Sequence, residues 1–176
     1  MSPAFLKLAT LGHKRLFDDV SYFWLLQSLI STSPQNAQLL FAKIQRVARH
    51  RPDIESLYTL SCFVLALDYK RPDLCEPVIQ YGMRAKPESW LIPATQGYMS
   101  GFALKDPLRA AYYYRKAAER PRCPSYIAGL SQTMLETGLR GVNAGETLKV
   151  IIEGLEDADF RDFLKSFLEQ HRSNQP

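Results

Sequence analysis

Apolar residues recur along this chain at the spacing of helices, and the strict alternation that is typical of strands is nearly absent. Four sets of mainly apolar residues follow the spacing i, i+3, i+4, i+7, which places each set on one helical face. The sets begin 35 residues apart, and the third is the least apolar: Tyr22, Leu25, Leu26 and Leu29; Leu57, Leu60, Ser61 and Val64; Ile92, Thr95, Gln96 and Met99; Ile127, Leu130, Ser131 and Met134. The pattern predicts an all-α protein.

A second set of positions repeats between these stripes at the same period of 35, except that Pro121 comes one residue early and the fourth copy follows after 34 residues. The copies are Leu40, Ile44, Val47 and Pro52; Cys75, Ile79, Gly82 and Pro87; Ala110, Tyr114, Ala117 and Pro121; and, more weakly, Ala144, Leu148 and Ile151. Repeats of this length are typical of stacked helix pairs. We therefore predict one domain over 1–176, with pairs at about 18–52, 53–87, 89–121 and 124–155.

Capping residues and prolines agree with this division. Side chains that cap helices, or prolines suited to a first turn, stand at the expected starts: Pro34, Asp53, Asp73, Ser89, Asp106 and Ser125. In 157–170 an apolar stripe predicts a closing helix, formed by Phe160, Phe163, Leu164, Phe167 and Leu168. Near the start, Phe5, Leu6, Leu8 and Leu11 predict a short helix that ends near Gly12.

Composition indicates a folded chain. It has 176 residues, of which 46% are hydrophobic and 23% charged, and polar residues interrupt every apolar run before it reaches the length of a bilayer span. Lys7 and Lys14 are among the residues that break up an export signal at the start. We expect a cytoplasmic protein, or one held at a membrane by a partner or a missing anchor. The net charge of +4 does not by itself argue for nucleic acid.

No motif for catalysis or metal binding is present in the sequence. The cysteines, Cys62, Cys75 and Cys123, are odd in number and widely spaced, so we expect small apolar fillers in place of a disulfide framework. The three histidines are far apart, and no glycine-rich phosphate loop or nucleophile turn occurs. We therefore expect no enzyme activity, no cofactor and no metal site.

The segment 90–121 is the best single copy of the repeat and resembles the tetratricopeptide repeat. It carries Gly97, Tyr98, Gly101, Asp106, Ala110, Tyr114, Ala117 and Pro121 in that family's order of small and aromatic residues. The resemblance covers about 20–155, with Leu40 and Gly82 standing where the family prefers alanine. It implies a right-handed α-solenoid of about four pairs, with an N-terminal helix and a C-terminal capping helix. The Leu11–Gly12 turn, the Phe23–Trp24 start and the stretch from Trp90 to Gly97 are similar to bacterial members of surface-assembly systems, which carry a membrane anchor.

In tetratricopeptide proteins the first helix of each pair lines a concave binding surface. The resemblance therefore implies that this chain is a scaffold or adaptor that binds a peptide or partner protein through an aromatic, weakly charged face. The predicted contact residues are Phe23, Gln27, Tyr58, Cys62, Trp90, Pro93, Gly97, Ala128 and Gln132. Tyr58 and Trp90 are the preferred anchors, although core packing explains such aromatic residues equally well.

Three further features leave alternatives open. Basic residues around two second helices fit either a contact with an acidic partner or phosphate, or solvated helix faces: Arg46, Arg49, His50, Arg51, Arg109, Arg115, Lys116, Arg120 and Arg122. Consecutive Tyr112, Tyr113 and Tyr114 diverge by about 100° each, so we expect at least one to face solvent or a partner. A helical-repeat binder of single-stranded RNA and a self-assembling spacer are the alternative functions.

Overall fold

The computed structural model describes residues 14–30, 36–140 and 144–173, which form helices joined by turns, with no strand among them. The prediction of an all-α protein is confirmed. Within these ranges no helix is both long and apolar enough to cross a membrane. The elements are α2 (Lys14–Ile30), α3 (Ala37–His50), α4 (Glu55–Phe63), the π-helical turn η1 (Val64–Asp68), α5 (Pro72–Ala85), α6 (Leu91–Phe102), α7 (Pro107–Ala118), α8 (Tyr126–Leu139), α9 (Ala144–Gly154) and α10 (Ala158–Ser173).

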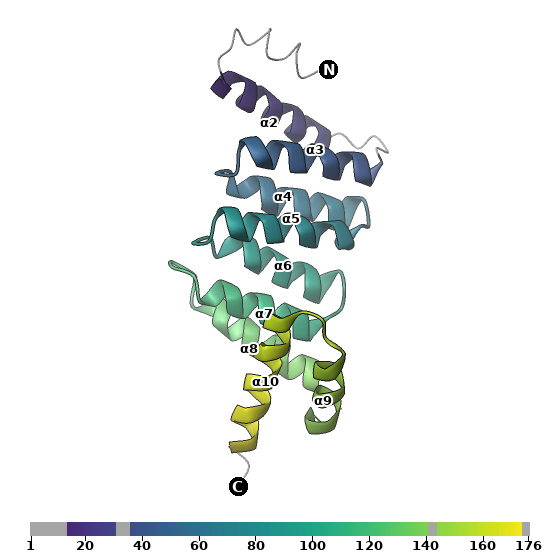
Figure 1. The fold of residues 1–176 in the computed structure, drawn as a ribbon, viewed down its shortest axis with the longest axis vertical. Helices are drawn as coiled ribbons and strands as arrows, with labels where there is room; N and C mark the ends of the chain where they lie inside the picture. Colours follow the sequence, from purple (N-terminus) through teal and green to yellow (C-terminus); the bar gives the residue numbers. More distant parts are fainter. Residues whose placement is uncertain (1–13, 31–35, 141–143, 174–176) are drawn as a thin grey trace.

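The helices from α2 to α8 follow one another down the long axis of the molecule, each running back across it (Figure 1). The pairs α2–α3, α4–α5 and α6–α7 pack against each other, and α4 also contacts α6. At the C-terminal end α9 packs against α10, which returns to α7 and crosses the direction of the other helices steeply. We call α2, α4, α6 and α8 the first helices and α3, α5 and α7 the second helices.

Residues at the repeated positions of the second helices form the centre of the molecule. All nine of those in the first three copies are buried: Leu40, Ile44, Val47, Cys75, Ile79, Gly82, Ala110, Tyr114 and Ala117. Two glycines lie directly against tyrosine rings. A Cβ on Gly82 would lie 2.7 Å from Tyr58 Cγ, and one on Gly97 would lie 3.0 Å from a ring carbon of Tyr114. The absence of a side chain is therefore what lets each tyrosine ring lie flat on its neighbouring helix.

The repeat extends to the backbone of the turns between paired helices. Lys70 and Lys105, 35 residues apart, both have φ of 56°, a left-handed conformation that favours glycine. The chain before each lysine closes with the same hydrogen bond to the carbonyl five residues earlier, from Tyr69 N to Val64 O and from Leu104 N to Met99 O, each 3.1 Å. Both turns thus end their first helix in the same way, although a lysine gives no sign of this in the sequence.

Caps account for several helix starts. The Asn36 side chain accepts a hydrogen bond from Gln38 N, and the Asp106 side chain accepts one from Arg109 N, each at 2.9 Å. Asp106 is thus a cap as predicted, with Pro107 in the first turn. Pro34 and the expected helix before Gly12 lie outside the described residues.

The apolar stripe of the closing helix packs inward, as its spacing indicates. Phe160, Leu164 and Phe167 of α10 are buried. The ring of Phe160 lies 5.0 Å from that of Tyr112 on α7, and Lys116 Nζ forms an ion pair with Asp159 Oδ2 at 3.0 Å. These contacts attach α10 to the side of α7.

The expectation that one of three consecutive tyrosines faces outward is wrong. Tyr112, Tyr113 and Tyr114 are all buried. Their directions do diverge, but α7 is covered on three sides: Tyr112 contacts α10, Tyr113 bonds to α5, and Tyr114 lies on Gly97 of α6. Periodicity within one helix cannot reveal how many neighbours will surround it.

The prediction for the cysteines is also wrong for two of them. Cys62 of α4 and Cys75 of α5 form a disulfide, with their Cα atoms 4.4 Å apart. The turn between the two helices brings together residues that are 13 positions apart in sequence. Gln96 Oε1 lies 3.2 Å from Cys75 Sγ, and Gln96 Nε2 has no partner. Since a bridged sulfur has no proton to donate, the opposite amide orientation, with Nε2 toward sulfur, suits this contact better.

Candidate functional site

Large apolar side chains gather on the exposed face of α4 and α6. Tyr98 is 42% exposed and Phe102 is 53% exposed. These two residues are four positions apart, so they project from the same side of α6. We use the name aromatic stripe for this face, which is made by Leu60, Phe63, Leu91, Tyr98 and Phe102.

The rings of the aromatic stripe form a continuous surface across two helices. Phe63 and Tyr98 occupy equivalent positions, 35 residues apart, and their ring centroids are 5.8 Å from each other. The Tyr98 and Phe102 rings stack at 5.4 Å, with Lys105 Nζ 5.0 Å from the centre of the Phe102 ring. Aromatic groups fixed by one another lose little freedom on binding, so this surface suits apolar anchors of a partner.

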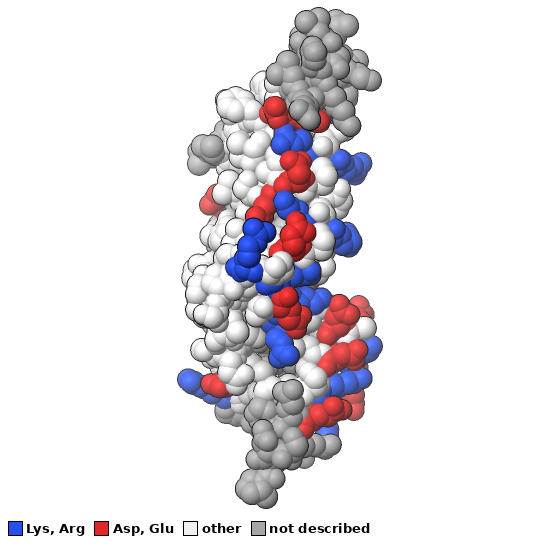
Figure 2. Space-filling model, turned by 90° about the vertical axis from the view of Figure 1, so that its left-hand side faces the viewer, with Lys and Arg blue, Asp and Glu red and all other residues white. Residues whose placement is uncertain are grey.

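Charged side chains gather elsewhere, in a band down the face shown in Figure 2. Several charged side chains pair with one another where the second helices end. Arg51 forms ion pairs with Asp19 and Asp53, and the hydrogen bond from Arg51 lowers the pKa of Asp53. Lys86 Nζ donates to Asp53 O at 3.1 Å. Because these charges satisfy one another, they offer a partner less than the aromatic stripe does.

Trp90, one of the two preferred anchors, is half-buried at the edge of a polar pocket of about 280 Å³. Lys86 and Arg122 line this pocket together with Glu55 and Glu88. The Glu55 carboxylate accepts a hydrogen bond from Ser89. Both signs of charge are present, so the pocket around Trp90 favours no single ligand class.

Four of the predicted contact residues are buried. Tyr58 donates its hydroxyl to Pro52 O at 3.0 Å, and burial raises the pKa of Tyr58 to about 12. Cys62 is part of the disulfide, and Gly97 lies under the Tyr114 ring. Pro93 is buried in α6 as well. These residues hold the helices together, and their burial leaves them no surface for direct contact with a partner.

The other predicted contact residues lie nearer the surface. Phe23 is 58% exposed, and Gln27, Ala128 and Gln132 are exposed on the first helices α2 and α8. The Gln132 amide donates to Glu136 Oε1 at 2.9 Å. Binding by these residues and by Trp90 stays a prediction.

Sequence reasoning missed the aromatic stripe because it chose a face one position away. The predicted series passes through Cys62 and Gly97, whereas Phe63 and Tyr98, whose rings belong to the aromatic stripe, follow these residues directly. A signal was present: Tyr98 and Phe102 are large aromatic residues that lie off the apolar stripe of their own helix. That stripe ends at Met99, which is fully buried.

The chemistry available on the aromatic stripe is contact with apolar groups, since none of its five residues is charged. Within the described ranges, no cluster of three or more His, Cys, Asp or Glu side chains is placed to hold a metal ion. Comparison with protein-family models, with curated proteins and with solved structures found no match to this chain.

Proposed function

We propose that this protein is a protein–protein interaction scaffold of the tetratricopeptide type. It is a right-handed α-solenoid of about four helix pairs, and it binds a peptide or a partner protein through the face of its first helices. The sequence repeat supports this proposal, and so does the burial of the repeated positions Leu40, Cys75 and Ala110 in three successive second helices.

Contacts at a separation of about one period also support it. Polar side chains bond to the next or the preceding unit, near the equivalent position, as expected for units that stack with a constant step. These contacts join Tyr22 with Ser56, Asp53 with Lys86, Glu55 with Ser89, Glu76 with Arg109, Gln80 with Tyr113, and Pro87 with Arg120.

The observation that carries the proposed binding is the aromatic stripe. Tyr98 and Phe102 are exposed and their rings continue into that of the partly buried Phe63, whereas isolated exposed apolar residues would need no explanation. The proposed ligand is a peptide with apolar anchors, in helical or extended form, because each first helix presents its side chains at regular steps.

Affinity capture with a variant of the stripe tests this function. Purified chain and the double variant Tyr98→Ala/Phe102→Ala are used to capture proteins from a lysate of the source organism, with and without nuclease treatment. Val150→Ala serves as the control, because Val150 is 70% exposed on α9, away from the stripe. We expect a protein that the wild type and the control retain and the double variant loses, with circular dichroism unchanged in all three.

Other results would replace the proposal. Loss of the captured material on nuclease treatment would indicate the helical-repeat RNA binder. The amount of RNA retained by the chain should then fall steeply as the salt concentration rises. Capture of this same chain alone would indicate the self-assembling spacer. A protein captured equally by all three forms would show that the aromatic stripe is not the binding surface.

A further inference from the structure

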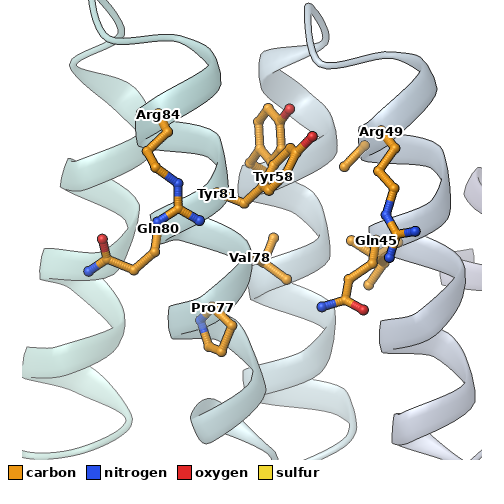
Figure 3. A pocket seen from close by; sticks show the side chains of 10 residues that line it. Gln45, Arg49, Tyr58, Pro77, Val78, Gln80, Tyr81 and Arg84 are labelled. Carbon is orange, nitrogen blue, oxygen red and sulfur yellow. The ribbon is translucent and has the colours of Figure 1, made fainter.

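A pocket of about 280 Å³ lies between the second helices α3 and α5, apart from the aromatic stripe on the first helices (Figure 3). Its floor is apolar, made by Ile44, Val78 and the ring of Tyr58. Its rim is polar and includes Arg49 on α3 and Arg84 on α5, on opposite sides of the opening. A volume of this size accommodates one large apolar side chain and lies just below the usual range for small-molecule sites.

The pocket exists because a position that is filled in the next unit is not filled here. The residue 35 positions after Val78 is Tyr113, whose ring is completely buried between α5 and α7. Its hydroxyl donates to Glu76 Oε1 and accepts from Gln80 Nε2, both at 3.0 Å. Between α3 and α5 the shorter Val78 leaves the equivalent space open.

The charge around the opening has one sign. Arg49 and Arg84 are both exposed, and neither forms an ion pair with a described carboxylate. No Asp or Glu lines the pocket. Each arginine lies in the last turn of its helix, where a cation is favourable, but that interaction leaves the guanidinium donors free to bind a carboxylate.

We propose that this pocket binds an acidic peptide by taking up one of its apolar side chains. The side chain lies on Ile44, Val78 and the Tyr58 ring, and neighbouring carboxylates of the peptide bond to Arg49 and Arg84. The apolar floor supplies the burial, and the two unpaired cations on opposite rims select for negative charge on both sides of the anchor. This second site is independent of binding by the aromatic stripe.

A displayed library of random 12-residue peptides tests the site. The library is selected on the wild-type chain and depleted on Val78→Tyr, which places in this pocket the side chain that fills the equivalent space in the next unit. We expect enriched peptides to carry a large aliphatic or aromatic residue with Asp or Glu within about three positions of it. Circular dichroism and a urea transition establish that Val78→Tyr folds.

Charge reversal provides a matched control that does not depend on packing. An enriched peptide is synthesised with an amidated C-terminus, labelled, and measured by fluorescence anisotropy. We expect Arg49→Glu to weaken its binding at least tenfold and Arg46→Glu, one turn earlier on the same exposed side of α3, to weaken it less than threefold. Arg84→Glu should match Arg49→Glu.

Three outcomes would overturn the proposal. The first is that no peptide is enriched on the wild type relative to folded Val78→Tyr. The second is equal weakening by Arg49→Glu and Arg46→Glu, which would indicate attraction to net charge alone. The third is binding that Tyr98→Ala abolishes and Arg49→Glu leaves intact, because the peptide would then lie on the aromatic stripe.

Discussion

Two neighbouring contacts between second helices use the same helical positions for opposite purposes. Between α5 and α7, Arg109 Nη2 pairs with Glu76 Oε1 at 2.7 Å, and Tyr113 fills the space beside them. Between α3 and α5 the residues equivalent to Arg109 and Tyr113 are Leu74 and Val78, and a pocket remains there. We refer to these as the filled seam and the open seam.

The side chain at one repeated position can therefore either join two units or leave a surface open to a ligand. The second helices keep buried residues at equivalent positions in both seams, with Ile44, Ile79 and Tyr114 each 35 positions apart in the sequence. What differs is the volume and hydrogen bonding of side chains outside that buried set. In a repeat fold such positions vary without loss of the fold, since each unit contacts mainly its neighbours.

The largest expected effect comes from opening the filled seam. Tyr113→Val should lower the free energy of unfolding by about 4 kcal/mol, because it removes a buried ring and leaves Gln80 and Glu76 without a partner for part of their bonding. Urea denaturation measures this loss. Tyr113→Phe keeps the ring and should cost about 1 to 2 kcal/mol; a larger loss for Phe than for Val would contradict a role in filling space.

The second-largest expected effect concerns the helix pair α4–α5, whose second helix forms one side of the open seam. α4 and α5 are joined by the Cys62–Cys75 disulfide, whereas the equivalent residues of α6 and α7 are Gly97 and Ala110. Reduction should destabilise the protein by about 3 kcal/mol, because the bridge restricts a 13-residue loop in the unfolded chain. The measurement is a urea transition with and without reductant. Cys62→Ala/Cys75→Ala is the control, and its transition should not respond to reductant.

A smaller effect appears at alkaline pH under the open seam. Burial raises the pKa of Tyr58 to about 12, from an ordinary value near 10. Above pH 10 the unfolded chain releases this proton and the folded chain keeps it, so stability is fully present below pH 10 and is lost as pH rises toward 12. The loss from Tyr58 should be roughly 2 kcal/mol. Comparing unfolding at pH 9 and pH 11.5, Tyr58→Phe should show a smaller decrease than the wild type.

The smallest expected effect is a gain in stability, and it should be equal for the turn between α4 and α5 and the turn between α6 and α7. Lys70 and Lys105 share the same left-handed conformation, with φ of 56°. Lys70→Gly and Lys105→Gly should each raise the free energy of unfolding by about 0.5 to 1 kcal/mol, because glycine adopts this conformation without strain. Thermal unfolding would detect the gain. A gain at one position alone would show that the two turns are not equivalent in solution.

The pattern of residues predicted the helical character of the chain well. Two helices overlap each predicted segment from 18–52 to 124–155, although α9 of the last segment packs against α10, and 157–170 contains most of α10. The repeated positions of the second helices, from Leu40 to Ala117, are all buried. Spacing and small residues are local properties, so the sequence records them directly.

The sequence predicted the candidate site less well, because exposure depends on neighbours that are distant in the chain. Tyr58 and Gly97 lie on first helices as expected, but second helices cover them. Leu60 belongs to the predicted inward stripe and is 43% exposed. A central helix that is packed on several sides buries more of its residues than a single apolar stripe indicates. The accessible face therefore lies one residue away from the predicted one.

By itself the sequence determined that the chain is helical, where most helices begin, and which positions repeat. Tertiary structure alone decided that Cys62 meets Cys75, that three consecutive tyrosines are all buried, and that Val78 leaves a pocket where Tyr113 leaves none. The physical reason is that helix formation follows from periodicity along one segment. Burial, pairing and open volume depend on the distances between segments, which the tertiary structure sets.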